Sequence, residues 1–200
     1  MQHFDLELHL NSRDNKGKSL LGLRKVLDED EAIQGAKNGD RRAQKALYDR
    51  LSSKMFAVCL RYMGDREEAE DVLQDGFLTL YSKLDSYTGD GSFEGWARRI
   101  FVNTALMRLR KNDVLKESDD IDTAWEVRSE EVSAVQDLGY KELLKYISEL
   151  SPGFRTVFNM YVIEGYSHKE IAEILGISEN TSRSQLLRAR TILQDRIKNR

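Results

Sequence analysis

The segment from Tyr166 to Arg190 constrains the fold most strongly, because it has the pattern of two amphipathic helices joined by a tight corner. Ser167 and Glu170 are spaced to form a capping box at the start of the first helix. Gly176 follows the last apolar residue of that helix, where a left-handed backbone conformation ends a helix at little cost. The segment therefore predicts a helix-turn-helix, in which one helix braces another that can lie in the major groove of DNA.

The second helix of this pair is predicted to begin after Ser178 and to bury Leu186, Ala189 and Leu193 on one face. Polar side chains occupy the other positions, and we expect them to point away from that face. They are Arg183, Ser184, Gln185 and Arg188.

The rest of the chain is also helical by its apolar periodicity, and its single proline among 200 residues fits a helix-rich protein. The glycines of segment 87–92 predict a loop. No strand alternation or internal repeat is found. Helices are expected over about residues 30–37, 40–63, 65–84, 93–111, 138–150 and 154–164. The fold class predicted is all-α, with two small helical domains joined by an acidic linker and the helix-turn-helix in the second.

The predicted domain boundaries follow changes in composition. Residues 1–27 lack a sustained period and form an N-terminal extension, which is either flexible or a dock for a regulator. Residues 28–112 form the first domain, 113–134 the acidic linker and 135–200 the second domain. Trp125 is the one potential anchor of the linker.

Charge is unevenly distributed, although the net charge is only −3. Residues 96–112 and 183–200 each carry +5, whereas residues 113–131 between them carry −6. Affinity for phosphates follows local potential, because salt screens charge over about 8–10 Å. One interpretation of the two basic segments is that they are solvated helix faces. Because segment 183–200 belongs to the helix-turn-helix, we favour the interpretation that both segments contact nucleic acid.

Composition also narrows the class of protein. No apolar run approaches the length of a membrane span, and the N-terminus lacks the order of a signal peptide. The single cysteine, Cys59, lies in an apolar run and is expected to be buried and unreactive. We therefore expect a cytoplasmic protein without membrane insertion.

The segment 65–84 carries an acidic outer face, for which a carboxylate metal site is one alternative. That chemistry needs Glu-x-x-His motifs on paired helices, and His3, His9 and His168 lack this spacing. No phosphate-binding glycine loop, nucleophile elbow or zinc ligand set is found. The sequence thus predicts a protein that is not an enzyme and has neither metal nor cofactor. A solvated face remains an alternative, but Gln74 and Phe77 among the acids also suit a protein partner.

The helix at 93–111 combines aromatic and basic residues. Composition alone favours a core role for Phe93 and Trp96. Aromatic residues beside an all-basic segment also suit the unstacked bases and phosphates of single-stranded DNA, which is the alternative.

Three motifs, together with the helix-turn-helix, resemble the extracytoplasmic-function sigma factors of the bacterial sigma-70 family. They are AEDVLQDGF at 69–77, FEGWARRIFVN at 93–103 and LSPGFRTVF at 150–158. The motifs occur in the family's order and spacing, and the resemblance covers roughly residues 30–112 and 135–198. Each motif alone is weak, but their conjunction is specific.

The resemblance implies what each domain binds. The first domain binds the β′ clamp helices of RNA polymerase and captures the melted minus-10 promoter element. The second places its recognition helix in the minus-35 element, and the β flap is its polymerase partner. The implied polymerase contacts are Glu70, Asp71, Gln74, Asp75 and Phe77. The implied minus-10 contacts are Tyr87, Phe93, Trp96, Arg98, Arg99, Asn103, Met107, Arg108, Arg110 and Lys111. The implied minus-35 contacts are Ser178, Thr181, Ser182, Arg183, Ser184, Gln185 and Arg188.

Two residues depart from the family pattern. Met107 stands where many relatives carry a polar residue near the base pocket, and Ser182 stands where a valine often anchors the recognition helix. The regulator that the resemblance implies is an anti-sigma factor. The competing hypothesis is a stand-alone helix-turn-helix regulator with a helical sensing or dimerisation domain, which binds palindromic duplex DNA without polymerase.

Overall fold

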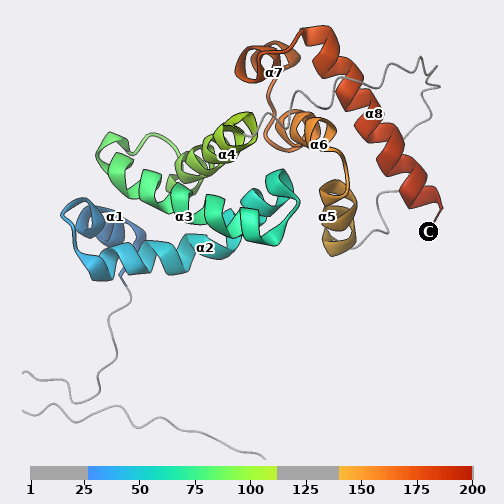
Figure 1. Ribbon diagram of the computed structural model, residues 1–200. Helices are drawn as coiled ribbons and strands as arrows, with labels where there is room; N and C mark the ends of the chain where they lie inside the picture. Colours follow the sequence, from blue (N-terminus) through green and yellow to red (C-terminus); the bar gives the residue numbers. More distant parts are fainter. Residues whose placement is uncertain (1–26, 112–139, 200) are drawn as a thin grey trace, which may run out of the picture.

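The computed structural model describes residues 27–111 and 140–199, which fold into helices and connecting turns without any strand (Figure 1). This confirms the all-α prediction. The acidic linker and nearly all of the N-terminal extension lie outside the described residues. The elements are α1 (Glu29–Lys37), α2 (Arg41–Met63), α3 (Arg66–Lys83), the 3₁₀ turn η1 (Leu84–Ser86), α4 (Phe93–Lys111), α5 (Tyr140–Ser148), α6 (Pro152–Phe158), the π-helical turn η4 (Asn159–Ile163), α7 (His168–Leu175) and α8 (Glu179–Lys198).

Side-chain caps set the starts of the helices. Asp28 caps α1 in a capping box with Glu31, so this helix begins slightly earlier than expected. The Asp65 carboxylate accepts from the backbone N–H groups of Glu67 and Glu68 at 2.9 and 3.0 Å. Gly64 ends α2 with a φ of 74°, in the left-handed region that a glycine adopts without strain.

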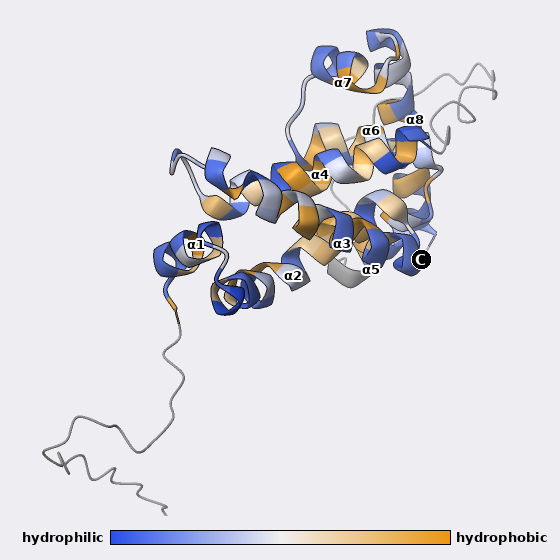
Figure 2. Cartoon of the chain, turned by 60° about the vertical axis from the view of Figure 1, so that its left-hand side comes forward, coloured by the Kyte–Doolittle hydropathy of each residue, from blue (hydrophilic) through white to orange (hydrophobic). Residues whose placement is uncertain are grey.

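Helices α1 to α4 surround the first part of the core. Leu47, Leu51, Val72 and Phe101 are almost completely buried there. Gly76 of α3 allows close approach of α4, because a Cβ atom at this position would lie 2.4 Å from the Phe101 ring. Figure 2 shows the hydrophobic residues concentrated between the helices and the hydrophilic ones on their outer faces.

A second cluster holds the C-terminal helices together. It contains Ile147 and Leu150 at the end of α5, and Ala189 and Leu193 on α8. Arg196 adds an ion pair of 2.7 Å with Glu149. The long helix α8 thus runs from the helix-turn-helix corner to the end of α5.

The helix predicted over 154–164 differs from the one observed. Helix α6 begins at Pro152, whose missing N–H costs nothing at a helix start, and it ends at Phe158. The chain then widens into the π-helical turn, where the N–H of Glu164 donates to the carbonyl of Asn159, five residues back, at 3.0 Å. This wider turn places Asn159 and Met160 in the interior.

The C-terminal helices dock against the C-terminal end of α2, where Figure 1 shows α5 and α6 side by side with it. Val157 and Met160 join the core that α1 to α4 form. The buried Arg155 guanidinium donates to the carbonyls of Tyr62 and Met63 at 2.9 and 2.7 Å. The two predicted domains therefore share an interface in this structure.

Candidate nucleic-acid interface

The helix-turn-helix forms through α7, the Gly176 corner and α8. Ser167 and Glu170 make the predicted capping box, and Gly176 ends α7 with a φ of 71°. Leu186, Ala189 and Leu193 are buried as predicted. The expectation that Gln185 points away from this face is wrong, since only 4% of its surface is exposed. It lies one turn before Ala189 and so falls within the apolar stripe.

Ser182, the departure from the family pattern, is completely buried. Its hydroxyl lies 2.9 Å from Nδ1 of His168, a hydrogen bond that joins the starts of α7 and α8. The ring of Tyr161 stacks on His168 with 4.4 Å between the centroids, and Arg190 lies over that tyrosine. Burial, with help from the nearby Arg183 charge, lowers the pKa of His168. The hydrogen-bonded pair of Ser182 and His168 therefore stands where a valine often anchors the recognition helix. The sequence did not indicate this role for His168.

The polar surface of α8 is narrower than predicted, because Ser182 and Gln185 are buried. Arg183 and Ser184 are exposed, while Thr181 and Arg188 are half-buried. The Arg183 guanidinium pairs with Glu179 at 2.8 Å. Ser178, the helix cap, accepts from the Thr181 N–H at 2.9 Å. Leu187, which the sequence did not single out, is also exposed in this segment.

One face of α4 carries a stripe of side chains that are exposed or, at Trp96, half-buried. Its members recur at helical spacing, so they lie in a row along the helix. Met107, the other departure from the family pattern, is 70% exposed and lies between Asn103 and Arg110. The members of this stripe are Trp96, Arg99, Asn103, Met107 and Arg110, and Lys111 is exposed at its end.

An aromatic cluster lies at the N-terminal end of the stripe. Phe93 is buried and stacks on Trp96 with 5.6 Å between the ring centroids. Tyr87 meets both rings, at 5.2 and 5.3 Å. Phe93 is a core residue, whereas Tyr87 and Trp96 keep exposed surface, and their contact with single-stranded DNA stays a prediction. Phe93 thus positions the other two rings.

A cavity of about 380 Å³ opens beside this cluster, between α1 and the loop before α4. Its lining residues include Glu29, Asp30, Lys37, Tyr87 and Phe93. Lys37 donates to the Tyr87 carbonyl at 3.0 Å and so fixes the loop on α1. Polar groups beside the partly exposed Tyr87 suit a nucleobase.

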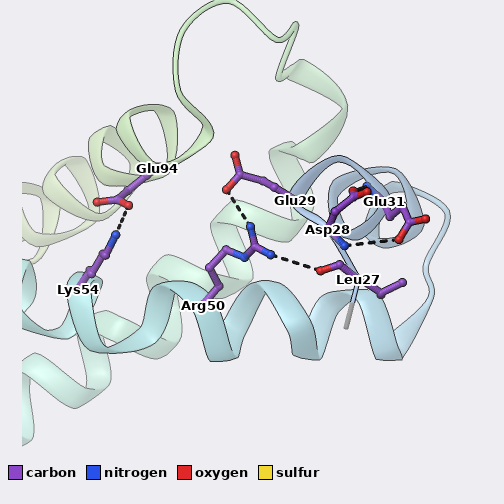
Figure 3. Close-up of polar contacts among 7 residues, drawn as sticks. All are labelled: Leu27, Asp28, Glu29, Glu31, Arg50, Lys54 and Glu94. Atoms are coloured by element: carbon purple, nitrogen blue, oxygen red, sulfur yellow. Dashed lines mark hydrogen bonds and ion pairs between the residues drawn. The ribbon is translucent and has the colours of Figure 1, made fainter. Parts of the chain in front are cut away.

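The neighbouring helix contacts hold the walls of this cavity in place (Figure 3). The Arg50 side chain of α2 reaches the Glu29 carboxylate at 3.2 Å and the Leu27 carbonyl at 3.3 Å, which holds the start of α1. Lys54 of α2 forms an ion pair with Glu94 in the first turn of α4. Helix α2 is therefore the common support for both sides of the cavity.

Two predicted minus-10 residues of α4 lie outside the stripe and are engaged elsewhere. Arg108 lies 3.6 and 3.5 Å from the carboxylates of Asp71 and Asp75 on α3. Arg98 makes two hydrogen bonds to Glu164, which follows the π-helical turn. The basic residues of α4 therefore face three different surroundings.

Helix α3 presents Asp71, Gln74 and Asp75 to the solvent, as predicted for a partner surface. Phe77 is only 4% exposed and packs edge-on against Phe101, so it is a core residue. Its neighbour Leu78 is 69% exposed. Leu78 lies four residues after Gln74 and three after Asp75, a helical spacing from which the sequence could have identified it as part of the same face.

No group of three or more His, Cys, Asp or Glu side chains within residues 27–111 and 140–199 is arranged to hold a metal ion. No helix of these two ranges is long and apolar enough to cross a bilayer.

The two halves of the chain match known protein families. Residues 47–114 match Sigma-70 region 2, and residues 140–193 match Sigma-70, region 4. The chain is 30% identical to the RNA polymerase sigma-H factor of Pseudomonas aeruginosa, over 79% of this chain and 88% of that protein. It is 27% identical to the ECF RNA polymerase sigma-E factor of Haemophilus influenzae, over 82% of this chain and 93% of that protein. A solved complex of the sigma factor RpoE with the anti-sigma factor NepR from Bartonella quintana aligns with a TM-score of 0.47 and 23% identity, covering 77% of this chain and 96% of that one.

Proposed function

Because this chain belongs to the extracytoplasmic-function sigma factors of the sigma-70 family, we propose that α3, α4 and α8 carry its contacts to RNA polymerase, the minus-10 element and the minus-35 element. A sigma factor lends promoter specificity to the polymerase, which carries out RNA synthesis itself. The observation that carries the proposal is the exposed α4 stripe within the first family region, with the helix-turn-helix in the second.

The α4 stripe and the cavity beside it form the proposed minus-10 site. Trp96 and Tyr87 offer partly exposed rings for stacking, and Arg99 and Arg110 offer charge to the backbone. The cavity accepts one unstacked base, which offsets the few kcal/mol that unstacking costs. Asn103 and Met107 contact the strand from the middle of the helix. Phe93 acts by supporting the two outer rings.

The exposed side of α8 forms the proposed minus-35 site. Arg183, Ser184 and Arg188 contact base edges or phosphates, with Thr181 at the start of the helix. Ser182 and Gln185 act from within the core and set the helix orientation. Ser178 contributes its cap, which directs the helix N-terminus towards a phosphate.

The exposed face of α3 forms the proposed clamp-helix contact. It combines one large apolar side chain, suited to the centre of an interface, with acids that suit its polar rim. Its residues are Glu70, Asp71, Gln74, Asp75 and Leu78, with Phe77 supporting them from the core.

The proposed working units are residues 28–112 and 135–200, joined by 113–134. The β flap is the proposed polymerase partner of the second unit, and an anti-sigma factor is the proposed regulator, on family membership alone. Transcription takes place with the polymerase on genomic DNA, so the protein acts in the cytoplasm in this proposal.

The test is co-purification of the full chain with bacterial core RNA polymerase at moderate salt, followed by transcription from a genomic fragment library. We expect stable association and new, discrete start sites. An Asp49→Arg variant, altered on an exposed position of α2 outside the proposed contacts, serves as the control and should behave like the wild type. Failure to associate, together with specific duplex binding by the chain alone, would instead identify a stand-alone regulator.

A further inference from the structure

Glu164 makes the most enclosed ion-pair cluster among the described residues, and it joins the two halves of the chain. Its carboxylate accepts from Nη2 of Arg61 at 2.9 Å and from Nε and Nη2 of Arg98 at 2.8 and 3.0 Å. The side chains of Arg61 and Glu164 are each 9% exposed. Arg61 lies near the end of α2, Arg98 on α4, and Glu164 just after the π-helical turn.

Neighbouring contacts hold Glu164 in this position. Arg155 donates to the carbonyls that end α2, and the Asn159 amide donates to the Arg61 carbonyl at 2.8 Å. Gly64 completes the fit, because a Cβ atom there would lie 2.4 Å from the Arg155 guanidinium. The carboxylate is thus delivered by docking of the C-terminal helices and leaves with them.

Two guanidinium groups, those of Arg61 and Arg98, meet on the single carboxylate of Glu164. Guanidinium groups bind the paired oxygens of carboxylates and phosphates with the same fork geometry. Arg98 makes this two-point contact with Glu164. When Glu164 leaves, its place beside the Arg61 and Arg98 guanidinium groups is open to another anion with paired oxygens. That arrangement attracts a backbone phosphate.

We propose that Arg61 and Arg98 form a binding site for a backbone phosphate of single-stranded DNA, which Glu164 occupies while the C-terminal helices are docked on α2. The proposal rests on the proposed minus-10 role of α4 and adds Arg61, which neither the motifs nor the exposed surface indicated. Docking and phosphate binding at this site exclude each other, because the carboxylate fills the space between the two guanidinium groups.

The test measures binding of the full chain to a fluorescent single-stranded oligodeoxynucleotide of random sequence, by anisotropy over a range of salt. Glu164→Gln keeps the size of the side chain and removes its charge, so we expect tighter binding by about tenfold at low salt and a steeper salt dependence. Adding Arg61→Gln to this variant should reduce the slope of log K against log salt by about 0.7, the value for one phosphate contact on a single strand.

Glu149→Gln is the matched control, because it removes a carboxylate that pairs with a different arginine, Arg196, and changes the net charge equally. It should bind like the wild type. Glu164→Asp provides a second variant that keeps the charge but shortens its reach, and it should bind with intermediate affinity. An oligonucleotide with a neutral methylphosphonate backbone should not distinguish any of these proteins.

A second readout follows docking directly, through energy transfer between labels at the exposed positions Ser86 and Asn199. Transfer should fall in Glu164→Gln and when the oligonucleotide binds the wild type. Equal affinity and salt slope for Glu164→Gln and Glu149→Gln would overturn the phosphate site. Unchanged transfer on oligonucleotide binding would overturn its occupation by Glu164. Neither result affects association with core polymerase, which tests the proposed function separately.

Discussion

Arg155 shows how one side chain can join distant parts of a chain. Its guanidinium donates to four backbone carbonyls, those of Tyr62, Met63, Ser148 and Leu150, at 2.7 to 3.0 Å. Burial lowers its pKa, yet a guanidinium with so high an ordinary value stays charged. The carbonyls belong to helix ends and have no helical partner of their own.

Arg155→Met should therefore destabilise the protein by about 3 kcal/mol or more, because it leaves several buried carbonyls without a donor. Urea unfolding of the full chain measures the change. Arg196→Met is the control and should cost less than about 1 kcal/mol, since its pair with Glu149 lies at the surface. Equal losses in both variants would mean that the Arg155 contacts contribute little.

His168 makes stability depend on pH. Burial and neighbouring positive charge lower its pKa in the folded protein, so the unfolded chain binds a proton more readily. This contribution is fully present above the unfolded pKa of about 6.5 and is lost as pH falls through the folded value. The charges that act on His168 are Arg183 and Arg190, which lower its pKa, and Glu179, which opposes them.

We expect His168→Gln to flatten the loss of stability on the acidic side. The comparison is between urea midpoints of wild type and variant at neutral pH and at a pH about one unit below the unfolded value. A variant that loses as much stability on acidification as the wild type would show that other groups dominate this pH range.

At the scale of single helices, caps and periodicity made most boundaries predictable. Ser167, Gly176 and the buried face of α8 depend on local spacing alone, which a sequence displays. Gln185 was predicted to be exposed because it is polar, although its position falls on the buried face of α8. The π-helical turn could not be predicted, since it depends on burying Asn159 against the Arg61 carbonyl, a contact that local sequence does not encode.

Helix α3 provides a sharp comparison of two adjacent apolar residues. Phe77 faces the core and Leu78 faces the solvent, although the motif contains both side by side. A sequence motif does not show which side of a helix each side chain faces until the helical period is applied to it. The acids Asp71 and Asp75 are exposed and Phe77 is buried, so Phe77 can support a partner surface only from the core, and the partner contact itself stays a prediction.

Leu78→Ala should weaken association with core RNA polymerase by about 1–2 kcal/mol and change stability by no more than about 0.5 kcal/mol. Phe77→Ala should instead destabilise the fold by about 3–5 kcal/mol, because it empties part of the core. Polymerase affinity and urea unfolding, measured on both variants, separate the two roles. Undiminished affinity in Leu78→Ala would remove that residue from the proposed interface.

At the scale of the whole molecule, the main surprise is the contact between the two halves. Arg155 and the carbonyl of Tyr62 are 93 residues apart in the sequence. The acceptors are backbone atoms, which every residue carries, so no side-chain pattern could have marked them. Both halves were predictable separately, whereas their docking required the three-dimensional structure.

Docking should make the described helices unfold together. Val157 and Met160 belong to the core of α1 to α4, so separating the halves exposes apolar surface on both sides. We expect tryptophan fluorescence and far-ultraviolet circular dichroism to report coincident urea transitions in the wild type. Arg155→Met should separate the two curves, and a wild type with two transitions would show that the halves are energetically independent.

The exposed stripe on α4 also bears on how such a protein can diverge. Asn103 and Met107 alternate with core residues such as Ala105 and Leu106, so the helix keeps its packing whatever occupies the outer positions. Exposed substitutions of this kind usually change stability by less than about 0.5 kcal/mol. If the stripe contacts the promoter as proposed, promoter preference can be redesigned by randomising these two positions while the scaffold stays the same. Duplicated copies of the gene could in this way acquire separate sets of target promoters.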